Sequence, residues 1–314
     1  MIRAEVIIVG GGPAGSACAW RLMQSHVDVL VLDQHRFPRL KPCAGWITPQ
    51  VVRDLELDVA SYPGGFTTFR SFQVAIHGFR FKLRTHQHAI RRVEFDDFLL
   101  RRSGAPVHVH TVKNIRQEPD GYVIDDAFCA RYLVGAGGTY CPVYRNLFKA
   151  DHPKARESLV VAMEEEFVYP YSDERCHLWF FENRLPGYSW YVPKANGVVN
   201  VGVGGKAEEL NARGDHLKNH WTFLVEKLER MGLVCGHDYQ PVAHSYFVRQ
   251  NLKQIRKDNA FLAGDAAGLA TVDMGEGIGP AIRSGLLAAE AILRDRPYNL
   301  SSIPRYSLRS LIGL

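Results

Sequence analysis

The chain has 314 residues, of which 46% are hydrophobic and 23% are charged, and its formal net charge is +5. This length and composition are typical of a globular protein with one large or two intertwined domains. No uncharged stretch reaches the roughly 18 apolar residues that a membrane-spanning helix needs. The basic residues are scattered and do not form a surface for nucleic acid. We therefore expect no bilayer-spanning segment and no nucleic-acid partner, while contact with a membrane surface stays open.

Cysteine and histidine usage gives no indication of a metal centre. The six cysteines form no C-x-x-C pair and have no histidine cluster of ligand-like spacing, so neither zinc nor an iron–sulfur cluster is expected. Arg3, an apolar run and small residues at 16–18 have the pattern of a secretory signal. Cleavage there would delete the first predicted strand, so we expect a cytoplasmic protein that could also lie at a membrane as a peripheral protein.

The N-terminus predicts a dinucleotide-binding unit. Residues 5–9 read as a buried parallel strand, and the following loop supplies G-x-G-x-x-G before an alanine-rich helix at 16–24. The first glycine permits the tight turn, the second lets a pyrophosphate approach the backbone, and the third lets the helix pack on the strand. The predicted cofactor-binding residues of this loop are Gly10, Gly12, Pro13, Ala14 and Gly15.

A second apolar strand at 27–32 ends in an acidic residue. Asp33 follows Gly15 at the spacing expected of the carboxylate that binds a ribose 2′-hydroxyl, and Gln34 adjoins it. A carboxylate there favours adenosine without a 2′-phosphate. The basic cluster at 36–41 comes directly afterwards and would suit either an anionic pyrophosphate or a solvated loop.

The middle of the chain predicts a second domain interleaved with the first. Residues 66–84 read as antiparallel strands joined at His77-Gly78, and the block 158–205 is rich in β-branched and aromatic residues, which suits a sheet platform. The other expected elements are a helix at 94–103, strands at 107–112, 121–124 and 131–134, and a helix at 216–231. We therefore place the cofactor-binding domain at 1–65, 90–157 and 255–314, and the substrate domain at 66–89 and 158–254.

A second cofactor-binding turn lies far from the glycine loop in sequence. The apolar strand at 259–263 ends in Gly264-Asp265, and small residues that open a helix follow. A carboxylate can accept hydrogen bonds from sugar hydroxyls, and free N–H groups at a positive helix end suit phosphate. Two distant parts of the chain are thus expected to bind one cofactor.

With these motifs located, the chain resembles the flavin oxidoreductases of the p-hydroxybenzoate hydroxylase superfamily, and in particular the geranylgeranyl reductase group. The segment at 37–45 is similar to that group's Lys-x-Cys-Gly-Gly segment, and Arg92-x-x-Phe95-Asp96-x-x-Leu99 is similar to its R-x-x-F-D-x-x-L helix start. The segment at 186–193 is similar to its Y-x-W-x-F-P motif. The resemblance extends from residue 4 to about residue 294.

The resemblance implies a Rossmann-type FAD-binding domain interleaved with an antiparallel-sheet substrate domain. The FAD-binding domain would be α/β, and the whole chain would be α+β. The implied cofactor is FAD, with its isoalloxazine ring between the two domains. Asp33 would hold the adenosine ribose, Arg92 would lie near the FAD, and Asp265 would bind the ribitol or pyrophosphate. Backbone N–H groups would approach the flavin ring and stabilise its anionic reduced form. The remaining implied cofactor-binding residues are Cys43, Ala44, Gly45, Gly277 and Ile278.

Three features depart from the family pattern. Gly137 stands where the superfamily usually has an Asp that links flavin binding with pyridine-nucleotide use, so NADPH, ferredoxin and other electron donors all stay open. Ala44 stands where a glycine is usual. The chain also stops soon after the helix expected at 280–293, whereas reductases of the group commonly carry a further helical region, so a full C20 isoprenoid tunnel is not assured.

The expected activity is reduction of C=C bonds in an apolar, isoprenoid-type substrate of lipid metabolism, by hydride transfer from N5 of the reduced flavin. Tyr188 and Trp190, two residues apart on a strand, would share one face and line an apolar slot. Cys43 is the catalytic candidate, because a thiol beside the flavin could act as acid, adduct former or redox partner. The acidic run Glu164–Glu166 reads as a solvated face and Glu276 as a helix cap, so none of these four is assigned to catalysis.

Two other functions fit the same fold. A flavin monooxygenase or halogenase would trap oxygen as a C4a-hydroperoxide, and the sequence lacks the tryptophan pair of the halogenases. An electron-carrying flavoprotein would bind FAD and an electron-donor protein without a small-molecule substrate of its own. The sequence leaves these readings open beside the reductase.

Overall fold

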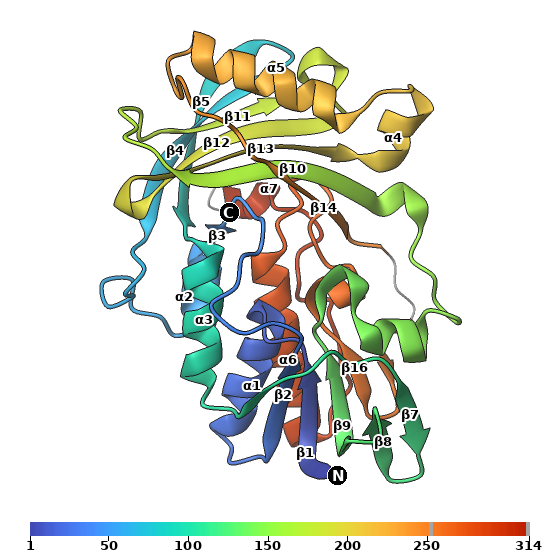
Figure 1. The fold of residues 1–314 in the computed structure, drawn as a ribbon. Coiled ribbons are helices and arrows are strands. Elements are labelled where there is room, and N and C mark those ends of the chain that lie inside the picture. Colours follow the sequence, from blue (N-terminus) through green and yellow to red (C-terminus); the bar gives the residue numbers. More distant parts are fainter. Residues whose placement is uncertain (251–253, 312–314) are drawn as a thin grey trace. The chain divides into compact units, whose positions relative to one another are not determined.

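The computed structural model describes residues 1–250 and 254–311 (Figure 1). The chain forms two compact units, and neither is contiguous in sequence. Unit 1 comprises residues 1–39, 93–155 and 247–307, and unit 2 comprises residues 40–92, 156–246 and the C-terminal segment from residue 308. Residues 251–253 and 312–314, which belong to the predicted domains, lie outside the described residues. Each unit is described by itself.

Unit 1 contains a sheet whose central strands are parallel. The strand order is β15-β16-β9-β1-β2-β6, with the hairpin β7-β8 attached to β9. β1 lies between β2 and β9 and pairs with both in parallel, and the apolar residues 6–9 of β1 are buried. The strands are β1 (Ile2–Val9), β2 (Val29–Asp33), β6 (Val107–Val109), β7 (Ile115–Glu118), β8 (Gly121–Ile124), β9 (Phe128–Gly135), β15 (Arg256–Lys257) and β16 (Ala260–Leu262).

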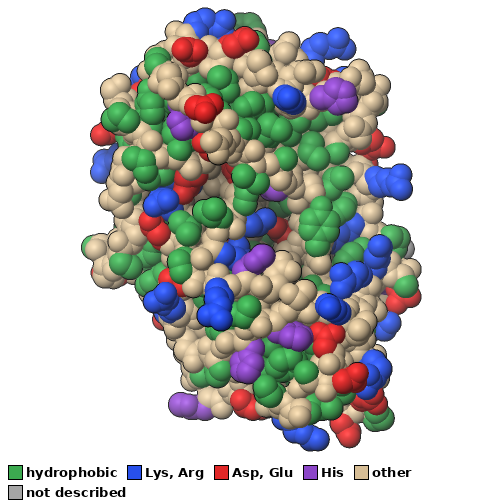
Figure 2. All heavy atoms as spheres, viewed as in Figure 1, with side chains coloured by type: hydrophobic (Ala, Val, Ile, Leu, Met, Phe, Trp, Pro, Cys, Tyr) green, Lys and Arg blue, Asp and Glu red, His purple; other side chains and the backbone are tan. Residues whose placement is uncertain are grey.

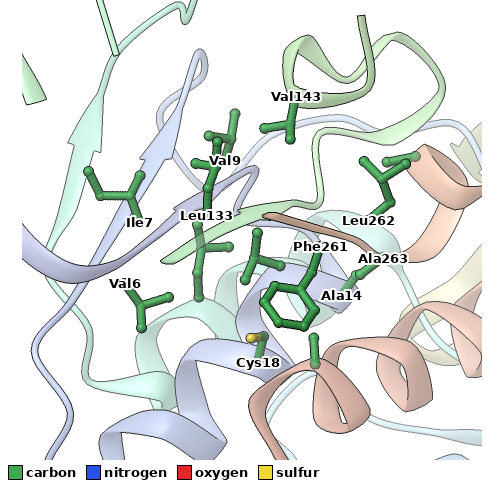
Figure 3. Packing of buried hydrophobic residues seen from close by; sticks show 14 of the residues in the cluster. Val6, Ile7, Val9, Ala14, Cys18, Leu133, Val143, Phe261, Leu262 and Ala263 are labelled. Atoms are coloured by element: carbon green, nitrogen blue, oxygen red, sulfur yellow. The ribbon is translucent and has the colours of Figure 1, made fainter. Parts of the chain in front are cut away.

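Two helices of unit 1 pack closely against each other. In α1 (Pro13–Met23) and α6 (Ile278–Arg294), small residues face one another, and a Cβ on Gly285 would lie only 2.1 Å from the Ala14 carbonyl oxygen. Side chains from β1, α1, β9 and β16, among them Phe261 and Cys18, form the hydrophobic core (Figure 3). α3 (Arg92–Ser103) contributes Leu100 to this core.

Unit 2 contains a mixed, mainly antiparallel sheet. Its strand order is β14-β10-β13-β12-β11-β4-β5-β3. Among the pairs of strands with a defined residue register, β11–β4 is parallel and the others are antiparallel. The strands are β3 (Trp46–Ile47), β4 (Thr67–Ile76), β5 (Phe79–Ala89), β10 (Leu159–Val168), β11 (Cys176–Phe180), β12 (Gly187–Lys194), β13 (Val198–Lys206) and β14 (Val242–Phe247).

Helix α5 (Leu217–Arg230) covers one face of this sheet (Figure 1). Its residues Trp221, Leu224 and Leu228 are buried against Val199, Val201 and other apolar side chains of that face. The helical spacing in the sequence predicted this contact surface. The short helices are α2 (Pro49–Asp54), α4 (Ala207–Ala212) and α7 (Leu308–Leu311).

Most expected elements are present, and the mixed α/β fold with a Rossmann-type unit is confirmed. One difference concerns Gly264-Asp265. The turn continues as the short 3₁₀ helix Gly264–Ala267, and the long helix begins only at Ile278. Contacts also group residues 40–65 with unit 2, whereas the sequence assigned them to the cofactor-binding domain. The assignment of each unit to FAD or to substrate stays a prediction.

The described residues include no helix long and apolar enough to cross a membrane. Within the same residues, no three His, Cys, Asp or Glu side chains are arranged to hold a metal ion. On the face drawn in Figure 2, Lys and Arg side chains lie among acidic and hydrophobic ones and do not form a continuous basic patch.

Candidate functional site

The glycine loop of unit 1 requires glycine for steric reasons. Gly10, directly after β1, has φ +111°, and a Cβ on it would lie 2.4 Å from the Ala136 carbonyl oxygen. A Cβ on Gly15 would lie 1.8 Å from the Gly10 carbonyl oxygen. In contrast, a Cβ on Gly12 would meet only the end of a flexible side chain, Nη2 of Arg39, at 3.2 Å. Gly12, although buried, therefore has only a movable side chain beside the position of a Cβ, and the other two glycines let the loop form.

The N-terminus of α1 lies beside this position. Gly12 is the N-cap and provides no side-chain hydrogen bond, and Pro13 occupies the first turn. The first-turn N–H groups of a helix have no partner within the helix, and they carry the positive end of its dipole. Pro13 suits this position because it lacks an N–H group. The loop and helix start thus fit the pyrophosphate of a dinucleotide.

Asp33 is fixed at the end of β2 beside the glycine loop. Its side chain is buried and accepts hydrogen bonds from the backbone N–H groups of Gly11 (2.8 Å) and His35 (2.9 Å). Both oxygens retain further acceptor capacity, as a ribose hydroxyl would need. The neighbouring Gln34 is exposed, and its side-chain amide is bonded to the His35 ring at 3.1 Å.

Arg39 belongs to the basic cluster whose role the sequence left open, and it lies beside the glycine loop. Its guanidinium group reaches Gly12, stacks over the Phe37 ring at 4.8 Å and lies 3.5 Å from the buried carboxylate of Asp96. These contacts hold a cation at the place where the pyrophosphate would approach. The basic cluster at 36–41 was the signal, and the structure singles out one of its members.

The second turn lies against the start of α1. Gly264 has φ +61°, and a Cβ on it would be 3.2 Å from the Cβ atoms of Ala14 and Ala281. Its N–H group donates to Ser284 Oγ (2.9 Å). The two distant glycine turns of the sequence therefore lie side by side in unit 1, as the pattern predicted.

Asp265 and the N-terminus of α6 also come together. Asp265 Oδ1 lies 3.5 Å from the position of a Cβ on Gly277, which is the N-cap of α6 and provides no side-chain hydrogen bond. Ile278 is the first residue of the helix, and Glu276 Oε1 accepts from the Gly279 N–H group at 2.7 Å, which confirms Glu276 as a helix-capping residue. The arrangement offers a carboxylate and free N–H groups to one ligand.

Lys154 approaches the same turn and was not anticipated. Its Nζ donates to the Asp265 carbonyl oxygen at 2.9 Å and lies over the rings of Tyr144 and Phe247. Burial lowers the pKa of Lys154 to about 8. No motif identified this lysine, because 110 residues separate it from the turn.

Gly137, which replaces the family Asp, lies against the glycine loop. Its backbone N would be 2.7 Å from a Cβ on Gly10, so the loop and residues 136–137 touch through their backbones. Arg92 begins α3 and is buried, but contacts group it with unit 2. Its contact with the cofactor therefore stays a prediction.

The segment containing Cys43 lies in unit 2. The Gly45 N–H group lies 3.3 Å from Cys43 Sγ, and Gly45, at φ +77°, could not carry a Cβ because the atom would be 2.2 Å from the Ile90 carbonyl oxygen. Cys43 and Ala44 are partly buried, and Gly45 is buried. Lys194 Nζ lies 3.5 Å from the Cys43 carbonyl oxygen. The segment is thus attached to the end of β12.

The sheet face opposite α5 is apolar over most of its width. Residues paired across neighbouring strands share a face, so the strand registers define rows. The central row consists of Phe81, Val74, Leu178, Trp190, Gly202 and Glu164. The adjacent row consists of Phe79, Ile76, Phe180, Tyr188, Gly204 and Ala162. Tyr188 and Trp190 do lie on one face, as expected, with ring centroids 5.6 Å apart.

The two glycines of β13 accommodate the Trp190 ring on this face. A Cβ on Gly202 would lie 2.2 Å from the Trp190 ring, so the indole lies across Gly202. Trp190 Nε1 donates to Asn200 Oδ1 at 2.7 Å, which fixes the ring. The result is a buried aromatic ring with its polar atom satisfied.

A charged group lies beside this face and was missed in the sequence. Lys194 is 0% exposed, and its Nζ lies 2.5 Å from Glu166 Oε2. Arg91 Nε lies 2.9 Å from the other oxygen of Glu166. The pairing depends on strand register, since 28 residues separate Lys194 from Glu166, and no local pattern reveals it.

Comparisons with known proteins agree with this geometry. A family model described as "NAD(P)-binding Rossmann-like domain" matches residues 8–89. An uncharacterized protein of Methanosarcina barkeri is 32% identical over 93% of this chain and 75% of its own length. The menaquinone reductase of Mycolicibacterium smegmatis is 30% identical, covering 92% of this chain and 76% of its own. The geranylgeranyl diphosphate reductase of Rhodobacter capsulatus is 26% identical, covering 93% and 75%.

A solved structure has the same fold. The geranylgeranyl bacteriochlorophyll reductase-like protein of Thermoplasma acidophilum superposes with a TM-score of 0.80 at 22% identity, covering 94% of this chain and 80% of that one. At this identity the likeness establishes the fold alone.

Proposed function

Because the chain belongs to the geranylgeranyl reductase-like family of FAD-dependent oxidoreductases, we propose that this enzyme reduces C=C bonds of an apolar, isoprenoid-type substrate. The observation that carries the proposal is the aromatic, glycine-backed face of the unit 2 sheet, with Trp190 lying across Gly202. Such a face suits a flat, apolar alkene better than a polar substrate. The relatives named for reduction of a menaquinone and of geranylgeranyl diphosphate support this substrate class.

The residues of unit 1 fit FAD in these roles. The glycine loop and the N-terminus of α1 would hold the pyrophosphate with Arg39, and Asp33 would hold the adenosine ribose. Asp265 would bind the ribitol or pyrophosphate region, and the N–H groups at Gly277 and Ile278 would donate to the flavin ring. When bound, FAD supplies the hydride.

In unit 2, Tyr188 and Trp190 would hold the alkene flat. Cys43 is proposed as a catalytic residue, supported by its position beside Gly45 and Lys194 and by the family motif. The electron donor is an external reductant. With Gly137 in place of the usual Asp, a protein donor such as a ferredoxin is favoured over NADPH.

We also propose that the β4–β5 hairpin contacts a membrane. Phe79 is 81% exposed and Phe81 is 46% exposed on one face of this hairpin, while Arg80 and Lys82 are exposed on the other. Exposed aromatic side chains with neighbouring cations suit the interface of an anionic bilayer. The hairpin also begins the two apolar rows that lead to Trp190 and Tyr188, so a lipid chain could pass from the bilayer onto the sheet.

The test is anaerobic reoxidation of the reduced flavin. The purified protein is loaded with FAD, reduced with dithionite and mixed with each of a panel of isoprenoid alkenes. The return of the oxidised flavin spectrum is followed, and the mass of the product is measured by mass spectrometry. Reoxidation with a product gain of two hydrogens supports the reductase. Reoxidation by oxygen with an oxygenated product would indicate the monooxygenase. Exchange with a ferredoxin or quinone alone would indicate an electron carrier.

A further inference from the structure

Glu164 differs from its two neighbours in the acidic run. Glu166 is paired with Lys194 and Arg91, and Glu165, on the opposite face of β10, accepts hydrogen bonds from the Gln240 N–H group (2.5 Å) and lies 2.9 Å from the His237 ring. Glu164 is only 2% exposed, and neither of its carboxyl oxygens has a hydrogen-bond partner among the described residues. The interpretation of Glu164 as part of a solvated face was therefore wrong. One acid of three is buried and left unpaired.

The position of Glu164 is the polar end of the central apolar row. Gly202 lies between Glu164 and Trp190 in that row. Because Gly202 has no side chain, no side chain of β13 separates the indole from the acid at this point. A Cβ on Gly202 would lie 2.2 Å from the Trp190 ring and 2.7 Å from Glu164 Cβ. A flat molecule on Trp190 would therefore have the Glu164 carboxyl group at its edge.

The surroundings favour the uncharged form of this acid. Burial raises the pKa of Glu164 to about 7, and the positive charges of Lys194 and Lys41 offset only part of that effect, while Glu166 adds to it. From β14, His244 Nδ1 faces Glu164 Oε1 at 4.0 Å and is also buried without a partner. Burial and the charges of Lys41 and Arg92 lower the pKa of His244 to about 4, so the imidazole is neutral. A pKa near 7 leaves a fraction of the carboxyl groups protonated at neutral pH, and the side chain of Asn200 also acts on this pKa, in the lowering direction.

We propose that Glu164 is the proton donor of the reaction, a role that rests on the proposed function. The substrate alkene loses its π bond and gains two C–H bonds. One carbon receives the hydride and its electron pair from the reduced flavin, and the other receives the proton from the Glu164 carboxyl group. Glu164 is left as a carboxylate and takes a new proton from solvent before the next turnover. An uncharged acid is compatible with an apolar substrate surface, whereas Glu166 is occupied by its ion pairs with Lys194 and Arg91.

The experiment compares Glu164→Gln with Glu165→Gln on the FAD-loaded protein. Glutamine keeps the shape and burial of residue 164 and removes the acidic proton, and Glu165→Gln makes the same change one residue away, on the opposite face. Reduced flavin is reoxidised anaerobically by the alkene and, in parallel, by ferricyanide, which takes electrons and needs no proton on carbon. Loss of a general acid slows a reaction by about 10²–10⁴-fold.

We expect Glu164→Gln to slow reoxidation by the alkene at least 100-fold, with the alkene's binding affinity and reoxidation by ferricyanide unchanged. In wild type and Glu165→Gln the alkene rate should fall as pH rises through about 7, because the acid form disappears, and Glu164→Gln should lack this fall. Equal alkene rates in Glu164→Gln and wild type would overturn the assignment of the proton donor alone. No reoxidation of the wild type by any alkene would instead overturn the proposed function.

Unfolding measurements supply a readout that does not depend on turnover. The folded pKa near 7 lies above the ordinary value for Glu, so the folded protein binds the proton more tightly than the unfolded chain between about pH 4.5 and 7. As pH rises over that range the wild type loses this contribution of Glu164, so its unfolding free energy should decrease relative to that of Glu164→Gln. The same pH dependence in both proteins would show that Glu164 is already ionised, and would also overturn the proposal.

Discussion

Replacing Gly15 by alanine tests whether the packing of the glycine loop, and not only its sequence pattern, supports the cofactor site. The added Cβ would lie 1.8 Å from the Gly10 carbonyl oxygen, whereas ordinary contact begins near 3.4 Å, so helix α1 and the loop would have to separate by about 1.6 Å. Overpacking of this kind costs about 1–3 kcal/mol, and the better helix propensity of alanine returns less than about 1 kcal/mol. We expect Gly15→Ala to lower the free energy of unfolding of the FAD-free protein by about 2 kcal/mol.

Gly12→Ala is the matched control for this change. Its Cβ would meet only Arg39 Nη2, at 3.2 Å, and a flexible arginine can move away. Because the only close atom belongs to this flexible side chain, stability should stay within about 0.5 kcal/mol of wild type. The same methyl group would stand where the pyrophosphate approaches, so FAD affinity should fall by about 5- to 150-fold, equivalent to about 1–3 kcal/mol.

Urea unfolding of the FAD-free proteins and a flavin fluorescence titration measure the two effects separately. The expected result is a crossed pattern, in which Gly15→Ala loses stability and Gly12→Ala loses FAD affinity while keeping its stability. Wild-type stability in Gly15→Ala would refute the packing argument. Wild-type FAD affinity in Gly12→Ala would refute the position of the pyrophosphate.

Three further changes test other parts of the molecule. Cys43→Ser should keep FAD bound but lose most turnover, and an unchanged steady-state rate would remove Cys43 from the mechanism. The pKa of His244 is about 4 in the folded protein and near 6.5 in the unfolded chain, so the unfolded chain binds more protons between these values. The contribution of His244 to stability should therefore fall by up to about 3 kcal/mol as pH drops from 6.5 to 4, measured by urea unfolding as the difference between wild type and His244→Gln. The double change Phe79→Ser and Phe81→Ser should reduce cosedimentation with anionic vesicles at least 10-fold, because each phenylalanine contributes about 1.5 kcal/mol or more when it is buried in lipid. Val168→Ser is the control, since Val168 is as exposed as Phe79, and it should leave cosedimentation unchanged. Equal sedimentation of wild type and both variants would reject the hairpin as the membrane contact.

The cofactor half of the site could be predicted because its determinants are local. The turn at Gly10, the helix start at Pro13 and the acid at Asp33 each depend on a few consecutive residues, and their order along the chain is itself informative. Even the approach of Gly264 to α1 followed from the expectation that two glycine turns bind one ligand. Lys154 escaped detection because its contact with Asp265 follows no short-range pattern.

The polar end of the sheet could not be predicted in the same way, because it depends on register. Three consecutive glutamates have the same appearance in the sequence, yet alternation sends Glu165 to one face and Glu164 and Glu166 to the other. Which of these two meets a cation is decided by the pairing of β12 with β13, which positions Lys194. A shift of one residue in that register would move each side chain to the opposite face of the sheet. The amino-acid composition does not reveal which register forms.

The same registers bear on how long a substrate the enzyme can hold. The central row crosses from β5 to β10, five strand spacings in a sheet, which amounts to about 24 Å at the usual separation of about 4.8 Å. The row is exposed at Phe81 and buried at Glu164. Under the proposed function, an apolar chain of several isoprene units would therefore enter over the β4–β5 hairpin, and its leading end would reach Glu164. Under the proposed function, the position of the reduced double bond along the substrate chain, and not the length of that chain, is therefore the property that Trp190 and Glu164 would select.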